Sequence, residues 1–467
     1  MPFVFFDVET TGTNTAFDQV VQFAAVRTDD RLNELEVFEV RSRLLPTVVP
    51  SPVAMRVNGV TVEQLADPAL PSHYEMVRRI RQKLLPWSPA VFVGFNSLDF
   101  DEHMLRQAFY KTLHPPYLTN TRGNSRCDAM RLIQASTIFA PGALAVPTID
   151  GTRKTYKLDR LAPANGFDHE DAHDALADVR ATIHLCRMLR EAAPQFWSSA
   201  IRLCRKSAAI DFVMTQHVFG LTEFFWGRGY SCVVSMIGHD DSNDNHLYVA
   251  NLAVDPRSLA GLSEPALRLR VGQRPKPVRC IRANAAPTLW SIDTEKDEVF
   301  PEALGADVYE LARRAAFLED NANLRARLIS AFEAGREPHE PSPHVEKQIY
   351  DGFPTDADNT LMNSFHEASW PDRLAIVERF QDARLHELGC RLIHCERPDL
   401  LDDVARRRHD ERIARCLLGL DNAVGWLTLR EAVQQANDIL VETNLPHIRA
   451  HRDFLQRRLA DAMRLAL

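Results

Sequence analysis

Two acidic residues near the N-terminus have a spacing that suits cation binding. Asp7 and Glu9 follow the apolar run 3–6 and precede Thr10-Thr11-Gly12. The run is too short for a helix and rich in β-formers, which predicts a buried strand. Side chains two residues apart on an extended chain point to the same face. The two carboxylates therefore converge, and they repel each other unless protons or cations compensate. An isolated Asp-x-Glu is more often a solvated strand end, so its meaning depends on the acidic residues downstream.

Three further candidates stand at predicted edges of the same domain. Asp101 opens a helix after a second apolar strand, and His173 and Asp178 lie at the start of a long amphipathic helix. Residues five apart cannot share a helical face, so His173 precedes or starts this helix while Asp178 projects from its first turns. Asp174 is expected to be the helix N-cap. Asp99 is the weaker claimant to the third carboxylate, because an ordinary surface role also explains it.

This set of side chains favours one chemistry. The hard oxygens of Asp7, Glu9, Asp101 and Asp178 suit two Mg²⁺ ions, or Mn²⁺ in their place, and not zinc. Such a pair of ions aligns a water, neutralises a phosphodiester and stabilises the leaving oxygen. His173 is not needed as a ligand and can take the proton from the water. The set as a whole predicts metal-dependent phosphodiester hydrolysis, although each residue alone is more often structural.

The elements that position these residues predict an α/β domain. Strands are expected at 20–28 and 35–43, joined by a hairpin turn, with a helix at 74–85 and a strand at 91–95. Strands that alternate with helices form sheets whose ligands gather at strand ends. We expect this domain to cover residues 1–195.

Two further domains are expected. Residues 196–343 contain short β-like runs at 231–237, 246–252 and 278–282, followed by helices at 307–334, and end in a proline-containing linker at 337–343. Residues 344–467 have helical periodicity and predict a bundle with the following helices: 371–388, 399–420 and 427–467.

Composition narrows the functional classes. The 467-residue chain carries a formal charge of −8 and is 45% hydrophobic and 25% charged, as expected for a multidomain globular protein. A polyanion must therefore meet a local basic surface and not an overall positive charge. Eight cysteines without a CxxC favour reduced thiols. With neither a leader nor an apolar run of about 18 residues, we expect a cytoplasmic protein that does not bind membranes.

The motifs together resemble a known family. The Asp-x-Glu-Thr of residues 7–10, the Asn-x-x-x-Phe-Asp of 96–101 and the His-x4-Asp of 173–178 resemble the three motifs of the DEDDh exonuclease superfamily, whose domain has a ribonuclease H-like fold. Further landmarks resemble bacterial exodeoxyribonuclease I in particular: Asp18, 22–25, 124–126, 164–166, 348–353 and 356–358. In one departure, Cys127 stands where that family usually has tryptophan.

The resemblance implies a function and a division of roles. The family degrades single-stranded DNA processively from the 3′ end to 5′-mononucleotides in DNA repair and recombination. It encloses the strand with an exonuclease domain, an SH3-like β domain and a C-terminal helical region. By motif, Asp7 would bridge both Mg²⁺ ions, Glu9 and Asp178 would hold the nucleophile-side ion, Asp101 would serve the other, and His173 would be the general base. The implied partners are single-stranded DNA and the C-terminal tail of single-strand-binding protein, and the implied state is a monomer.

The substrate path is predicted from charge and aromatic residues. Glu9 and Arg126 lie within the family motifs, and Lys157, with Arg153 and Lys154, precedes the last catalytic helix. A basic run without intervening acids offers phosphate contacts, although a solvated face explains it nearly as well; its residues are Arg268, Arg270, Arg274, Lys276, Arg279 and Arg282. An aromatic group interleaved with Arg228 suits base stacking, although a small β domain also needs aromatic core residues; its members are Phe224, Phe225, Trp226 and Tyr230.

Two rival functions remain open from the sequence. One is a 3′-to-5′ exoribonuclease of the same superfamily, because metal ions bind phosphates and do not report on the sugar. The other is a nucleic-acid-binding scaffold with an inactive nuclease domain, against which the retention of all five motif residues argues.

Overall fold

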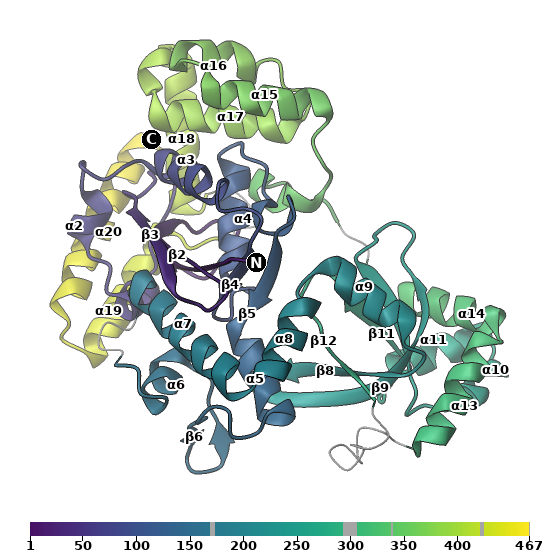
Figure 1. Cartoon of the computed structure of the whole chain (residues 1–467). Helices are drawn as coiled ribbons and strands as arrows, with labels where there is room; N and C mark the ends of the chain where they lie inside the picture. The colour runs from purple at the N-terminus through teal and green to yellow at the C-terminus, as the bar shows by residue number, and fades with distance from the viewer. Residues whose placement is uncertain (169–172, 293–305, 338–339, 421–424, 467) are drawn as a thin grey trace.

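The computed structural model describes residues 1–168, 173–292, 306–337, 340–420 and 425–466. Two five-stranded sheets and a C-terminal set of helices make up the chain (Figure 1). The predicted linker and last helix are described except for Pro338, His339 and Leu467, which lie outside these ranges. In the described part of the chain, no helix is long and apolar enough to span a membrane.

The N-terminal sheet has the order β3-β2-β1-β4-β5. Its strands β1 to β3 are antiparallel, whereas β4 and β5 run parallel to β1. The strands have the following bounds: β1 Phe3–Thr10, β2 Val20–Thr28, β3 Glu34–Arg41, β4 Val91–Gly94 and β5 Ser125–Asp128. The predicted hairpin joins β2 and β3, where the Asp29 carboxylate accepts hydrogen bonds from the backbone N–H groups of Arg31 and Asn33.

Alternation along β1 decides which face receives the acidic residues. Val4, Phe6 and Val8 pack in the cluster formed with α3 and α4, and Phe3 and Phe5 pack in the cluster formed with α7. Asp7 and Glu9 continue the second series, so they point to the side that α7 covers. Figure 1 shows the sheet between these helices.

The helices of this first part, with a small hairpin, surround the sheet. Its helices are α1 Pro52–Asn58, α2 Val62–Ala66, α3 His73–Leu84, α4 Asp101–Lys111, α5 Ala129–Phe139, α6 Leu158–Ala164, α7 Ala175–Ala192, α8 Pro194–Leu203 and α9 Lys206–Thr215. The small hairpin consists of β6 Thr148–Ile149 and β7 Arg153–Lys154, and a short 3-10 turn covers Leu118–Asn120. Thr61 and Gln64 form a capping box at the start of α2.

The second sheet is antiparallel with the order β11-β10-β9-β8-β12. Its strands are β8 Phe219–Phe225, β9 Arg228–His239, β10 His246–Asn251, β11 Val278–Arg282 and β12 Thr288–Ser291. One face packs against a group of helices at the outer edge of the molecule, on the right of Figure 1. These helices are α10 Arg257–Ala260, α11 Glu264–Gly272, α13 Val308–Glu319 and α14 Ala322–Glu333.

The C-terminal helices form two groups, α15 to α17 and α18 to α20 (Figure 1). They have the following bounds: α15 Asp356–Glu367, α16 Trp370–Val377, α17 Ala383–Glu396, α18 Asp403–Leu418, α19 Leu429–Glu442 and α20 Pro446–Leu465. Short 3-10 turns cover Val345–Tyr350 and Pro398–Leu400.

Two of the predicted C-terminal helices are each divided in the structure. The expected helix 371–388 is interrupted before Asp382, whose side chain accepts from the Arg384 N–H and caps α17. The expected helix 427–467 is interrupted before Pro446, which stands in the first turn of α20. The helical spacing of charged and apolar residues continues across both breaks, so the sequence pattern does not reveal where the second helix of each pair begins.

Candidate active site

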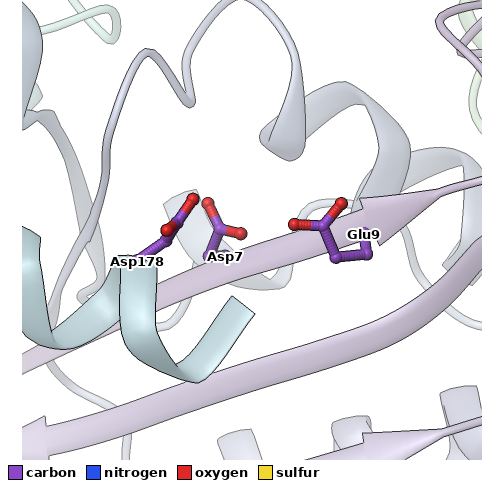
Figure 2. Close-up of side chains that lie close together, drawn as sticks. All are labelled: Asp7, Glu9 and Asp178. Atoms are coloured by element: carbon purple, nitrogen blue, oxygen red, sulfur yellow. The ribbon is translucent and has the colours of Figure 1, made fainter. Parts of the chain in front are cut away.

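Three carboxylates meet where β1 faces the start of α7. Asp7 and Glu9 extend from β1 and Asp178 from the first turn of α7 (Figure 2). One oxygen from each of the three carboxylates lies within 4.8 Å of the others. The spacing of Asp7 and Glu9 on an extended strand places both on this face, as predicted. Their separation is compatible with a shared cation, the site that the sequence predicts.

Asp101 approaches the same strand from the opposite neighbour. It is the first residue of α4 and is buried, and its carboxylate accepts a hydrogen bond from the Val8 backbone N–H, between the two acidic residues of β1. That N–H group is available because β4 pairs with β1 only as far as Phe5. Asp99, the alternative third carboxylate, is exposed and binds the Arg131 guanidinium at 2.8 Å. The structure thus brings Asp101, and not Asp99, to the carboxylates.

Burial and like charge raise the pKa values of this group. Burial, followed by the charges of Asp101, Asp178 and Glu9, raises the pKa of Asp7 well above its usual range. Burial and the charge of Asp178 raise the pKa of Glu9 to about 8, although a hydrogen bond from Asn58 opposes the shift. Burial raises the pKa of Asp101 to about 7. Desolvated carboxylates that repel one another suit hard divalent cations, which would replace the shared protons.

His173 lies at the rim of this group. It precedes the N-cap of α7, as its spacing from Asp178 predicts, and its exposed side chain lines the adjoining cleft. Its backbone has a φ of 70°, and its N–H donates to an Asp178 carboxylate oxygen at 3.3 Å. The expected cap is confirmed, because the Asp174 carboxylate accepts from the Leu176 and Ala177 N–H groups.

Side chains of the sheet fix the start of α7. The Asp174 carboxylate also accepts from the Gln22 amide at 2.9 Å and from the Arg41 guanidinium at 2.8 Å. These contacts, with the hydrogen bonds of the cap, lower the pKa of Asp174 despite its partial burial. Asp174 therefore remains charged and ties the helix that carries Asp178 to β2 and β3.

Two further residues at the site were not predicted. Asn58, the last residue of α1, donates to the Thr10 carbonyl at 3.0 Å and hydrogen-bonds the Glu9 carboxylate. Asp128 is buried at the start of α5 and accepts from the Asn96 and Leu98 N–H groups, which orders the turn before α4. Both residues contact partners that are distant in sequence and close only in the folded chain, so local sequence motifs do not identify them.

A cleft of about 1130 Å³ leads to the carboxylates between the exonuclease-like part and the second sheet. His173 and Asp178 line it on one side, and β8, the end of β11 and the start of β12 in the second sheet line it on the other. Five cationic side chains line this cleft, which suits the binding of a polyanionic chain. The cationic residues are Arg131, Arg153, Lys154, Lys157 and Arg282.

Some of the residues predicted to contact the substrate lie in the cleft, and others lie outside it. Lys157 is exposed in the cleft, whereas Arg268 and Arg270 lie on α11, and Arg274 and Lys276 follow it outside the cleft lining. Arg270 donates to the carbonyls of its own loop, and Arg279 pairs with Glu223. Arg126 is buried and donates to the Asn284 carbonyl at 2.8 Å, which joins β5 to the second sheet. DNA contact by these residues stays a prediction.

The aromatic group forms an exposed tip and not a core. Trp226 and Gly227 make a two-residue turn between β8 and β9 with φ values of 51° and 72°, the backbone that such hairpins require. Trp226 is 96% exposed, and Phe225 and Tyr230 beside it are also exposed. A Cβ on Gly227 would lie 3.3 Å from the Tyr156 ring, so the turn rests against the loop that carries Lys157.

Comparisons with known proteins show that this chain is similar to exonucleases. Residues 4–186 match the family described as Exonuclease, and residues 343–455 match the family described as Exonuclease I C-terminal domain. Exodeoxyribonuclease I of Escherichia coli (strain K12) is 29% identical over 404 residues, which cover 83% of each chain.

Solved structures of this E. coli enzyme have the same fold. A crystal structure with a dA16 oligonucleotide has a TM-score of 0.84 at 24% identity and covers 99% of each chain. A zinc ion bound form with single-stranded DNA has a TM-score of 0.83 at the same identity. The predicted α/β fold with an exonuclease domain and a C-terminal helical domain is confirmed. The SH3-like description of the second sheet and the residue boundaries of the three domains stay predictions.

Proposed function

We propose that this chain, which is similar to exodeoxyribonuclease I over most of its length, degrades single-stranded DNA processively from the 3′ end to 5′-mononucleotides. We place this Mg²⁺-dependent reaction in DNA repair and recombination. The observation that carries the proposal is the convergence of Asp7, Glu9, Asp101 and Asp178 at a cleft of about 1130 Å³ that His173 also lines.

Each residue of the site has a proposed role. Asp7 would hold both cations, Glu9 and Asp178 one of them, and Asp101 the other. When bound, two Mg²⁺ or Mn²⁺ ions neutralise the phosphodiester and lower the pKa of the attacking water. The chemistry of the donor set supports this, because three carboxylates with raised pKa values, those of Asp7, Glu9 and Asp101, need positive charge nearby.

His173 supplies the proton acceptor. Its side chain is exposed on the cleft that Asp178 also lines, and its backbone N–H donates to the Asp178 carboxylate. We propose that it takes the proton from the water that attacks the terminal phosphodiester. The departing 3′-terminal nucleotide then carries the 5′-phosphate.

The cleft supplies strand contacts. Lys157 would bind a phosphate near the cleavage site together with Arg153 and Lys154, and Arg282 would do so from the second sheet. Trp226 and Phe225 at the hairpin tip would stack on bases, a contact that tolerates any sequence. The predicted phosphate contacts of Arg126, Arg268, Arg270, Arg274 and Lys276 would follow the strand beyond the cleft.

The remaining proposals concern the cellular setting. We propose a monomeric, cytoplasmic enzyme that also binds the C-terminal tail of single-strand-binding protein. Eight free cysteines, four of them buried, fit a reducing compartment.

Digestion of matched substrates tests the function. A 5′-labelled single-stranded DNA, its RNA equivalent and its duplex are incubated with Mg²⁺ or with EDTA. We expect metal-dependent shortening of the single-stranded DNA alone, blocked by a 3′-phosphate. Faster loss of the RNA would instead identify an exoribonuclease, and tight binding without cleavage would identify a scaffold.

A matched pair of variants tests the site itself. D101N removes a buried carboxylate beside Asp7, whereas D99N removes an exposed one only two residues away. We expect D101N to lower the rate by at least about 100-fold and D99N to leave it nearly unchanged, since one metal ligand contributes several kcal/mol. Equal rates for the two variants would exclude Asp101 from the site.

A further inference from the structure

The strand end that carries Glu9 pairs with its own sheet on one side only, through β2. β4 pairs with β1 only as far as Phe5, and the register with β2 shifts between Glu9 and Thr10. Such a bulge changes the direction of the side chains next to it. The position of the Glu9 carboxylate therefore depends on contacts made by the chain that follows.

Those contacts come from the segment before α1 and from α1 itself. The Ser51 N–H donates to the Thr11 carbonyl at 2.7 Å. At the other end of α1, the Asn58 amide donates to the Thr10 carbonyl and hydrogen-bonds the Glu9 carboxylate. A shift of α1 would thus move the hydrogen-bond donor of Glu9 together with the backbone that follows it.

The last helix of the chain holds this segment in place. The Arg458 guanidinium on α20 donates to the Val48 carbonyl at 2.6 Å and to the Pro46 carbonyl at 2.5 Å, and His451 contacts the Pro50 carbonyl at 3.2 Å. Val49 is 5% exposed and packs in a core cluster whose other buried members come from α18, α19 and α20. Helix α1 packs directly on α19 and α20.

A second contact reaches the loop after Glu9. The Asn14 amide donates to the Gly425 carbonyl, and the Phe17 ring lies 5.0 Å from the Trp426 ring and 5.8 Å from the His344 ring. Both routes therefore lead from residues more than 300 positions away in the chain to the few residues around Glu9.

We propose that the C-terminal helices position the Glu9 carboxylate for metal binding, with Arg458 and Asn58 as positioning residues. Arg458 fixes the segment 46–51, this segment fixes α1, and α1 holds Asn58 against Glu9. The inference rests on the proposed role of Glu9 as a metal ligand. Residues that orient a metal ligand change metal affinity about 10-fold to 100-fold when they are removed.

Four variants of the full chain test the route: R458M, N58A, the double variant, and R457M as the control. Arg457 neighbours Arg458 on α20 but is exposed, so R457M removes the same charge without the two carbonyl contacts. Mn²⁺ binding to the DNA-free protein is measured by calorimetry, and the rate is measured against Mg²⁺ concentration.

We expect R458M and N58A each to weaken Mn²⁺ binding about 10-fold, with R457M unchanged. The rate should recover at high Mg²⁺ while the KM for DNA stays the same, since the loss is in metal affinity. If Arg458 acts through Asn58, the double variant binds Mn²⁺ no more weakly than N58A. A merely structural role would give no recovery by metal.

Three outcomes would overturn the positioning role. The first is an R458M variant that binds Mn²⁺ as tightly as R457M does. The second is a double variant whose loss of Mn²⁺ affinity is the sum of the losses in R458M and N58A. The third is a loss of Mn²⁺ affinity in both R458M and the milder R458K that circular dichroism shows to result from unfolding. A wild-type protein that binds Mn²⁺ but cleaves no nucleic acid would instead refute the proposed function, and the comparison of R458M with R457M would still decide the positioning role.

Discussion

The carboxyl groups of Glu9 and Asp101 hold protons near neutral pH in the metal-free protein. Burial raises their pKa values to about 8 and about 7, from ordinary values of 4.5 and 3.8. A cation binds the charged carboxylates, so binding must release the protons that these groups hold. We expect roughly one to two protons released per protein at pH 7 and an affinity that rises from pH 6 to pH 8.

Calorimetry in two buffers with different ionisation enthalpies measures this release. D99N serves as the control, because Asp99 is exposed, paired with Arg131 and not part of the carboxylate group. Metal binding whose heat is the same in both buffers would contradict the raised pKa values.

His173 should affect turnover and not metal binding. His173 lines the same cleft as Asp178, but the proposed cation site consists of carboxylates alone. We expect H173A to lower kcat by about 100-fold to 10,000-fold, the usual contribution of a general base, with Mn²⁺ affinity unchanged. H217A, which removes a histidine with a 76% exposed side chain, should have a normal kcat. A normal kcat for H173A would remove the histidine as the base.

Among single residues, the sequence predicts those whose positions depend only on their own strand or helix. Asp7 and Glu9 follow from strand periodicity and Asp174 from capping, and the structure has each where it was expected. Asn58 was missed because its partner, Glu9, is 49 positions away and meets it only through the packing of α1. Arg126 was predicted to contact the substrate, which stays a prediction, and its contact with the Asn284 carbonyl was missed.

Among the elements, the β8–β9 hairpin bears most directly on substrate binding. Its turn residue Trp226 is 96% exposed beside the cleft, although an aromatic side chain of this size is usually buried. Stacking on a base contributes about 1–3 kcal/mol. We therefore expect W226A to weaken binding of single-stranded DNA by roughly 5-fold to 150-fold and W226F to retain most of it.

Fluorescence anisotropy with a labelled oligonucleotide in EDTA measures this affinity without cleavage. Y309A is the matched control, because Tyr309 on α13 is 81% exposed but lies outside the cleft lining. An unchanged affinity for W226A would assign the exposed tip to some role other than stacking.

Several strands and helix boundaries could not be predicted from the periodicity of apolar residues. The hairpin has a clear turn, Trp226-Gly227, but β8 itself was not predicted because its aromatic residues were considered as a group and not as a strand. β5 was also missed, since its four residues include polar ones that are buried only because it runs parallel to β4. The helices α16 and α17 were merged because a capping aspartate inside a charged stretch resembles a surface position.

For the whole molecule, the C-terminal helices and the exonuclease domain share one buried core. Tyr74, Tyr110 and Leu113 of the exonuclease domain pack in the same cluster as Phe365 and Leu388 of α15 and α17. The α/β fold of the N-terminal part and the helical C-terminal part were predictable from periodicity along the chain. That the parts share cores was not predictable, because the residues that meet are distant in sequence.

This shared core contains a pair of histidines that should make the molecule sensitive to acid. The rings of His114 and His366 stack at 3.7 Å; His366 donates to the Leu113 carbonyl and accepts from the Tyr74 hydroxyl. Burial lowers the pKa of His366 to about 4 and, followed by the charge of His366, lowers that of His114 further. An unfolded histidine takes up its proton near pH 6.5, whereas folded His366 does so only near pH 4. The stabilisation is therefore complete above pH 6.5 and is lost as the pH falls toward 4.

We expect the free energy of unfolding to fall by on the order of 3 kcal/mol for His366 alone between pH 7 and pH 4, measured by denaturant titration at several pH values. H366Q keeps an amide for the Leu113 carbonyl but cannot be protonated, so its stability should depend less on pH over this range. H239Q, which removes an exposed histidine on β9, should keep the wild-type dependence. If H366Q and H239Q lose the same stability between pH 7 and pH 4, the acid sensitivity lies outside the core that joins the two domains.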